Sequence, residues 1–129
     1  MNADERREQL DKLTEAIIRS AFKVSNTLGV GFLEKVYENA LAVELRKTGL
    51  KVHQQYDVKV RYEGVVVGEY AADLLVDDSV VVELKATDGI EDIHKAQCLN
   101  YLRAADLRVG LVVNFGQPTL QVKRVVNKF

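Results

Sequence analysis

Three charged side chains interrupt two otherwise apolar stretches near the middle of the 129-residue chain. Asp73 lies within residues 71–76, and Glu83 and Lys85 lie within residues 80–85. Two carboxylates beside one ammonium group suit a hard divalent cation, because Mg²⁺ is commonly held by one or two carboxylates together with water and substrate phosphate oxygens. The three side chains are therefore candidates for a metal site. The alternative is an ion-paired trio on a solvated sheet face, which carries no chemistry.

The spacing of the two carboxylates brings them together if the two stretches form an antiparallel hairpin. With a three-residue loop after Val76, that residue pairs with Val80, and Asp73 lies directly across from Glu83. A two-residue loop would instead pair Asp73 with Val82, but such tight turns favour a glycine that this loop lacks. Cross-strand neighbours have Cβ atoms about 4.5 to 5.5 Å apart, where two like charges are destabilising unless something offsets them. A bound cation would remove this repulsion.

The elements that must position these residues follow from the spacing of the apolar side chains. Spacings of three and four predict helices, whereas alternation and continuous apolar runs predict strands. The first helix carries apolar residues from Leu10 onward and ends at Gly29, the second follows Gly31 and ends at Gly49, and the third covers residues 90–105. The predicted strands cover residues 52–62, 65–76, 80–86, 108–115 and 120–126.

The order of these elements predicts a mixed sheet packed against helices, of the α/β or α+β class. The first three strands follow one another through short turns, which indicates an antiparallel meander. The strand at 108–115 is nearly all apolar, as expected of a strand covered on both faces. It is reached through a helix, and this connection favours parallel pairing with a right-handed crossover. We expect residues 1–129 to form one domain, with residues 1–13 as a frayed extension of the first helix.

The charge balance argues against several classes of protein. Eighteen Lys and Arg against 19 Asp and Glu give a formal net charge of -1, so the chain is not a sequence-independent trap for nucleic acids. A nucleic-acid contact would need a local patch, for which the candidates are Arg103, Arg108, Lys123 and Arg124. The apolar runs are far shorter than the roughly 18 residues of a membrane span, and the charged N-terminus lacks the apolar core of a secretory signal. We therefore expect a cytoplasmic protein without a membrane partner.

The few cysteines and histidines limit the metal chemistry further. A single cysteine, Cys98, excludes an intramolecular disulfide and a zinc site built from several cysteines, and His53 and His94 are too few for a histidine-rich site. Any metal would be held mainly by oxygen. Cys98 lies on a helix four residues before Leu102, which favours a small buried hydrophobe over a nucleophile. We expect His94 to be an ordinary surface residue.

Three motifs, in this order along the chain, carry a resemblance to a known superfamily. Residues 31–37, GFLEKVY, are similar to the motif that names the GxxExxY protein family. Asp73 followed by Glu83-Leu84-Lys85 resembles the motif of the PD-(D/E)XK nuclease-like superfamily, with Ala72 in place of a proline that supplies no ligand. Residues 97–101, QCLNY, resemble the QxxxY motif of the exonuclease-like branch. The resemblance covers about residues 14–124.

This resemblance implies a fold and a set of catalytic residues. The fold is a PD-(D/E)XK nuclease-like core, a mixed β-sheet with a central antiparallel hairpin flanked by helices. Asp73, Glu83 and the backbone carbonyl of Leu84 would bind Mg²⁺ or Mn²⁺, and Lys85 would orient or polarise the attacking water. Glu34 would bind the metal directly or through water, although the helix dipole also favours a glutamate in a first turn.

The resemblance also implies contacts to a substrate. Gln97 and Tyr101 are four residues apart and share one helix face, from which they would contact the site or a substrate phosphate. The alternative is an exposed amide and a partly buried ring. Tyr37 is a candidate substrate contact and equally a core aromatic with a tethered hydroxyl.

The function that these residues predict is metal-dependent hydrolysis of phosphodiester bonds in DNA or RNA. The alternative is a catalytically inactive nuclease-fold module that binds nucleic acid, a nucleotide or a protein partner. The last strand or an exposed helix face could also serve homodimerisation, which is the commonest oligomeric state of small soluble proteins.

Overall fold

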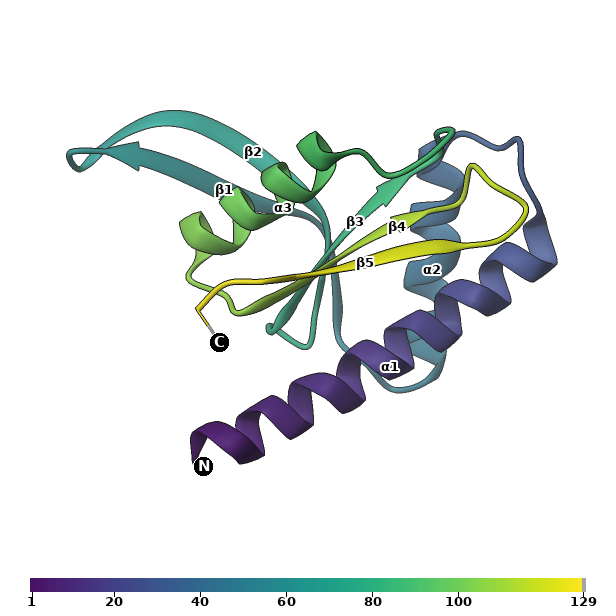
Figure 1. Cartoon of the computed structure of the whole chain (residues 1–129), viewed down its shortest axis with the longest axis horizontal. Coiled ribbons are helices and arrows are strands. Elements are labelled where there is room, and N and C mark those ends of the chain that lie inside the picture. The colour runs from purple at the N-terminus through teal and green to yellow at the C-terminus, as the bar shows by residue number, and fades with distance from the viewer. Residues whose placement is uncertain (129) are drawn as a thin grey trace.

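Helices cover both faces of a five-stranded sheet in the computed structural model, which describes residues 1–128 (Figure 1). The helices are α1 (Ala3–Leu28), α2 (Glu34–Lys47) and α3 (Asp92–Ala105). The strands are β1 (Val52–Tyr62), β2 (Val65–Val76), β3 (Val80–Lys85), β4 (Val109–Asn114) and β5 (Gln121–Val126). Every predicted element is present, and the main difference in bounds is the start of α1.

The strands lie across the sheet in the order in which they occur along the chain. β3 and β4 are parallel, and the other neighbouring pairs are antiparallel. The parallel pair is joined through α3, as the helical connection predicted. The mixed sheet with a central antiparallel hairpin, β2–β3, is therefore confirmed.

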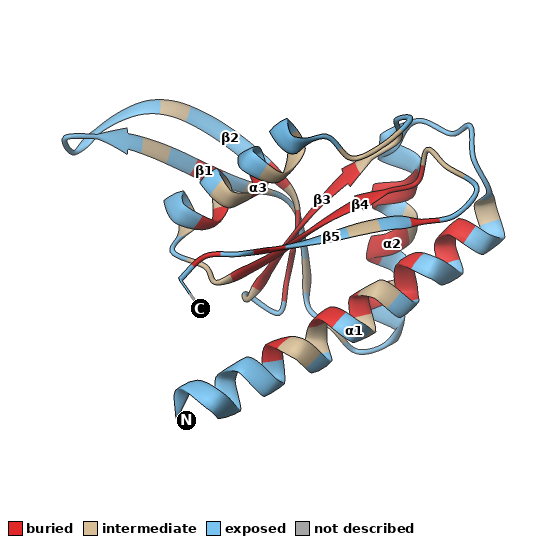
Figure 2. Cartoon of the chain, viewed as in Figure 1, coloured by how far each residue is buried: buried red, intermediate tan, exposed pale blue. Residues whose placement is uncertain are grey.

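β3 and β4 form the centre of the core, where Figure 2 shows continuous burial. Alternate residues of a strand face opposite sides of the sheet. Val80 and Val82 accordingly pack in the apolar cluster that contains α1 and α2, whereas Val81 packs with Cys98 and Leu102 of α3. Each helical layer thus has its own apolar cluster, which explains why β4 is buried along its whole length.

The first turns of α1 lie in residues 1–13, the segment expected to extend the first helix. The helix begins at Ala3, where the side-chain oxygen of Asn2 accepts a hydrogen bond from the backbone N–H of Glu5 at 2.8 Å. This cap satisfies a donor that a helix start otherwise leaves unpaired. Leu10 is the first buried side chain, so the preceding turns extend along solvent. Within residues 1–128, no helix has both the length and the apolar character needed to cross a membrane.

β1 and β2 continue beyond the end of β3 as a two-stranded hairpin, which we call the arm (residues 56–72; Figure 1). Only the last three residues of β2 pair with β3, whereas the β1–β2 ladder extends to Tyr62 and Val65. Most of the arm is exposed (Figure 2), including Val65 and Val67. Its base is held against α3 by Val58 and Ala72, which share an apolar cluster with that helix.

Candidate active site

β2 and β3 separate at a point that we call the fork (Asp73, Glu83 and Leu84). The hairpin has the predicted register, in which Val76 pairs with Val80, and its ladder ends after three pairs. Immediately beyond, the backbone N–H of Asp73 donates to Glu83 Oε1 at 3.3 Å, and the backbone N–H of Leu84 donates to Asp73 Oδ2 at 2.8 Å. The two carboxylates therefore satisfy backbone donors at the place where the strands no longer satisfy each other.

Glu83 is a buried carboxylate, with 7% of its surface exposed. Burial raises its pKa to about 8, and the charge of Asp73 adds to the increase. A hydrogen bond from the Asp73 backbone and the charge of Lys85 act in the opposite direction but do not compensate. The acidic pair is thus not a surface ion-pair network, and a cation bound beside it would favour the ionised form of Glu83.

Lys85 extends the site along the same face of β3. It lies two residues after Glu83, so both side chains project from the α3 side of the sheet. Its charge lowers the pKa values of Glu83 and Glu34, but its ammonium group forms no ion pair within 4 Å among the residues that the structure describes. The ammonium group is therefore close to the fork and available to another anion.

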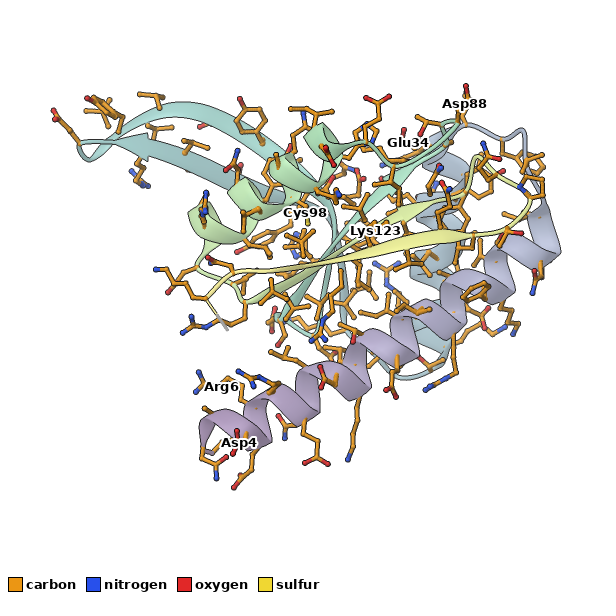
Figure 3. The ribbon with its side chains drawn as sticks, in the orientation of Figure 1. Asp4, Arg6, Glu34, Asp88, Cys98 and Lys123 are labelled. Carbon is orange, nitrogen blue, oxygen red and sulfur yellow. The ribbon has the colours of Figure 1, made fainter. Side chains whose placement is uncertain are left out.

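Glu34, at the first position of α2, is brought to the same region. Partial burial raises the pKa of Glu34, and the charges of Asp73 and Glu38 raise it further. The charges of Lys85 and His94 lower it, but the net change is an increase. Figure 3 shows Glu34 at the end of the molecule where β3 leads into the loop that carries Asp88. The start of α2 thus converges with β2, β3 and the start of α3.

The carboxylate and carbonyl oxygen atoms at the fork suit a hard divalent cation. In an extended strand, the N–H and C=O groups of one residue point to the same side. The Leu84 N–H points to Asp73, so the Leu84 carbonyl is also directed to the β2 side. The carbonyl of the next residue, Lys85, points the other way and accepts the Phe115 N–H on the β4 side. Within residues 1–128, no three His, Cys, Asp or Glu side chains surround one point. A cation would therefore be held by Asp73, Glu83 and the Leu84 carbonyl, with water or phosphate oxygens completing its shell.

A second buried carboxylate, Glu38, supports the fork from behind. It is 3% exposed and accepts hydrogen bonds from the side chains of Gln54 and Gln55, at 2.8 and 2.7 Å, and from Lys35 at 3.0 Å. The Gln55 amide also lies 3.4 Å from Asp73 Oδ1. Sequence reasoning missed Glu38, and its only signal was a position one helical turn after Glu34.

Tyr37 is placed inside the protein rather than at the site. Its ring is fully buried and stacks on Phe115 with 4.7 Å between ring centroids. Its hydroxyl donates to the Gly29 carbonyl at 2.6 Å and accepts the Phe32 N–H at 3.3 Å. This placement favours the interpretation of Tyr37 as a core aromatic with a tethered hydroxyl over a substrate contact.

Cys98 and His94 of α3, which the sequence analysis also considered, have local roles. Cys98 is fully buried, as predicted, and burial raises the pKa of its thiol to about 12, which makes it a poor nucleophile (Figure 3). His94 Nδ1 accepts the backbone N–H of Glu91 at 3.0 Å and so caps the start of α3. His94 thereby uses one ring nitrogen for the helix, and its charge acts to lower the pKa of Glu34.

Gln97 and Tyr101 line a groove between α3 and the arm. The groove has a volume of about 560 Å³, and it is lined by Val60, Arg61, Val67, Gly68, Tyr70, Gln97, Asn100, Tyr101, Arg103 and Ala104. Tyr101 is partly buried, and its pKa is raised first by burial and then by the charges of Glu83 and Asp73. The predicted stripe of Gln97 and Tyr101 is thus present, and it connects the fork with the groove.

The predicted patch of Arg103, Arg108, Lys123 and Arg124 does not form as one cluster. Neighbouring residues of β5 point to opposite faces of the sheet, so Lys123 and Arg124 are separated. Arg124 pairs with Asp11 of α1 at 2.6 Å, whereas Arg103 lines the groove on the other face. Positive charge is instead gathered in the groove, where Arg61 of the arm accompanies Arg103.

Asn114 holds the loop that follows Lys85. It is fully buried, its amide group binds both the N–H and the C=O of Thr87 at 3.0 Å, and its oxygen also accepts the Gly116 N–H. A Cβ atom at Gly116 would collide with the Thr87 backbone, so the loop after β3 and the loop after β4 are in close backbone contact there. These contacts set the path of the chain as it leaves the fork.

Comparisons with known proteins bear on the fold and the family. The family described as PD-(D/E)XK nuclease superfamily matches residues 11–125. None of the curated proteins that were compared matches the chain. Among solved structures, the crystal structure of SSO0001 is similar, with a TM-score of 0.55 and 19% sequence identity over 96% of this chain and 62% of that protein. The chain therefore spans less than two thirds of the length of SSO0001, and the likeness at this identity concerns the fold.

Proposed function

Because the chain belongs to the PD-(D/E)XK nuclease superfamily, we propose that it is a nuclease that uses Mg²⁺ or Mn²⁺ to hydrolyse phosphodiester bonds of DNA or RNA. The observation that carries this proposal is the fork, where buried Glu83 accepts the backbone N–H of Asp73 and Asp73 accepts that of Leu84. Lys85 lies beside them and forms no ion pair with any residue that the structure describes. The narrower likeness to the GxxExxY family rests on residues 31–37 and is part of the same proposal.

The position of each residue at the fork supports a role in this reaction. Asp73, Glu83 and the Leu84 carbonyl would hold the cation. Bound there, it would supply Lewis-acid chemistry: a lower pKa for a water ligand and compensation of the negative charge on the phosphate. The Lys85 ammonium group would donate hydrogen bonds that orient the attacking water. Glu34, which shares this electrostatic environment, would bind the cation directly or through water.

Calorimetric titration with Mn²⁺ and Mg²⁺ tests the proposal without knowledge of the substrate. We expect the wild-type protein to bind metal and Glu83→Gln to lose binding, because the amide oxygen carries no charge. Glu15→Gln, an exposed glutamate of α1, is the matched control and should bind as the wild type does. Labelled single-stranded and duplex DNA and RNA should then be cut only when metal is present. Cleavage by Glu83→Gln at the wild-type rate would contradict the proposal.

One observation favours the non-catalytic alternative. Asp73 and Glu83 accept backbone N–H groups of the fork, so both carboxylates have a structural use without any metal. A nuclease-fold module that binds nucleic acid, a nucleotide or a protein partner would keep this use. It would show neither metal binding nor cleavage, while Glu83→Gln would leave partner binding intact.

A further inference from the structure

We infer that the groove between α3 and the arm binds single-stranded nucleic acid and guides the strand to the fork. This inference rests on the proposed function, which it deepens by naming the form of the substrate. The groove joins two parts of the chain that lie far apart in sequence, and it holds the charge, the aromatic rings and the amide groups that such a ligand requires.

The charges of the groove suit a phosphate backbone. Arg61 and Arg103 are the charged residues that line it, and both are exposed. Neither guanidinium group forms an ion pair with a carboxylate among the residues that the structure describes. Two cationic groups without partners, in a protein whose net charge is -1, mark a local attraction for an anion rather than a general property of the surface.

The aromatic residues of the groove suit unpaired bases. Tyr70 of the arm is 52% exposed, and its ring centroid lies 5.8 Å from that of Tyr101 of α3. Gly68 leaves space for the Tyr70 ring, since a Cβ atom there would lie 3.2 Å from it. Stacking on tyrosine is available to every base that is not already stacked in a duplex. Gln97 and Asn100 supply amide donors and acceptors along the same wall.

The size and direction of the groove favour one strand over two. Its volume of about 560 Å³ is that of a site for a small ligand, a size that suits a few unpaired bases. Along α3 it extends from Gln97 to Ala104, about 10 Å at 1.5 Å per residue. Along β2, Tyr70 stands three residues before Asp73, which is also about 10 Å. A strand that stacks on Tyr70 therefore lies within reach of the acidic pair, since Asp73 follows three residues further along β2.

Fluorescence anisotropy in the presence of EDTA tests this inference independently of cleavage. The probes are a labelled mixed-sequence DNA strand, the RNA strand of the same sequence, and each strand annealed to its complement. We expect the single strands to bind at least tenfold more tightly than the duplexes. The DNA and RNA arms show whether the groove discriminates between the two sugars.

Variants of the groove separate its two kinds of contact. Arg61→Ala and Arg103→Ala should each weaken binding and reduce the slope of log Kd against log salt by about 0.7. Tyr70→Ala should weaken binding roughly fivefold or more without changing that slope. Lys59→Ala, which pairs with Asp57 outside the groove, and Arg19→Ala on α1 are the charge-matched controls and should bind as the wild type does.

The results distinguish this inference from the proposed function. Strand binding that the groove variants weaken, without cleavage under any metal, supports the groove and overturns the nuclease. Metal-dependent cleavage that the groove variants leave unchanged supports the nuclease and overturns the groove. Duplexes that bind as tightly as single strands would also overturn the groove.

Discussion

Asp73 Oδ2 accepts the backbone N–H of Leu84 at 2.8 Å, just beyond the last pair of the β2–β3 ladder. In the function that we propose, one carboxylate would perform two tasks, because it satisfies a backbone donor at the fork and would also bind the cation. The two tasks depend on different properties of the side chain. The hydrogen bond needs an oxygen acceptor, whereas the cation needs a negative charge.

We predict that Asp73→Asn folds as stably as the wild type, while Asp73→Ala loses about 1 to 3 kcal/mol of unfolding free energy. The asparagine oxygen can still accept the Leu84 N–H, whereas alanine leaves that buried donor without a partner. Urea denaturation measures both values, and Mn²⁺ titration should show that both variants have lost metal binding. Equal destabilisation by the two substitutions would show that the charge, and not the hydrogen bond, stabilises the fork.

Glu83 should give the stability of the metal-free protein a characteristic pH dependence. The folded protein holds this proton up to a pKa of about 8, whereas the ordinary value is 4.5. Between these values the folded state binds the extra proton, so the unfolding free energy falls as the pH rises through this range and levels off above it. Glu83→Gln should lack this fall and be more stable than the wild type at pH 9, by on the order of a few kcal/mol.

Urea denaturation at a series of pH values, with EDTA present, checks this prediction. Glu15→Gln is the control, because an exposed glutamate on α1 should leave the wild-type slope unchanged. If Glu83→Gln keeps the slope, another group is responsible for the titration.

Lys85→Ala should separate metal binding from turnover. The ammonium group is not a metal ligand, so we expect Mn²⁺ affinity to change little. We expect the rate of single-turnover cleavage to fall by about 10²- to 10³-fold, as for other groups that orient or stabilise the reacting atoms. Lys51→Ala, which removes a lysine paired with Asp78 at the surface, is the control. A rate that stays at the wild-type level would remove Lys85 from the site.

Glu38→Ala should weaken both the fold and the site. The substitution leaves the side-chain amides of Gln54 and Gln55 and the Lys35 ammonium group without their acceptor, which we expect to reduce the unfolding free energy by about 1 to 3 kcal/mol. Because Gln55 also contacts Asp73 Oδ1, Mn²⁺ affinity should fall as well. Glu15→Ala serves as the control in both measurements, and unchanged metal affinity would limit Glu38 to a purely structural role.

Gly110 and Cys98 should be energetically coupled. A Cβ atom at Gly110 of β4 would lie 2.6 Å from Cys98 Sγ, so Gly110→Ala should be destabilising by about 1 to 3 kcal/mol. In a Cys98→Ala background the sulfur is gone, and the same substitution should be less destabilising. A double-mutant cycle by urea denaturation measures this coupling. Strictly additive effects would show that the Val81 carbonyl, 3.3 Å from the same position, is the group that clashes.

The sequence predicted those features that depend on local spacing. The register of Val76 with Val80 followed from the length of the loop, and it brought Asp73 and Glu83 together correctly. The prediction that Lys123 and Arg124 contribute to one basic patch was wrong for an avoidable reason, because adjacent residues of a strand point to opposite faces. Local patterns do not show how two elements will pack, which is why the role of Glu38 was missed.

The contact between Glu38 and Gln55 shows most clearly what local sequence patterns do not predict. It joins α2 to β1, and it requires a backbone φ of 54° at Gln55, which a residue with a side chain rarely adopts. No periodic signal in the sequence marks such a conformation. The groove is a similar case, because Tyr70 and Tyr101 meet only after the arm has been laid along α3.

The separation of β2 from β3 divides the sheet into two cooperative units of unequal stability. From Leu74 to Val76, β2 is bordered by strands on both sides, whereas along the arm it has β1 alone. An isolated two-stranded ribbon is marginally stable, so amide hydrogens of the arm should exchange with deuterium through local opening, and those of β3 and β4 only through global unfolding. The acidic pair stands on the boundary between these units. Local opening of the arm should therefore reach Asp73 and leave the strand that carries Glu83 in place.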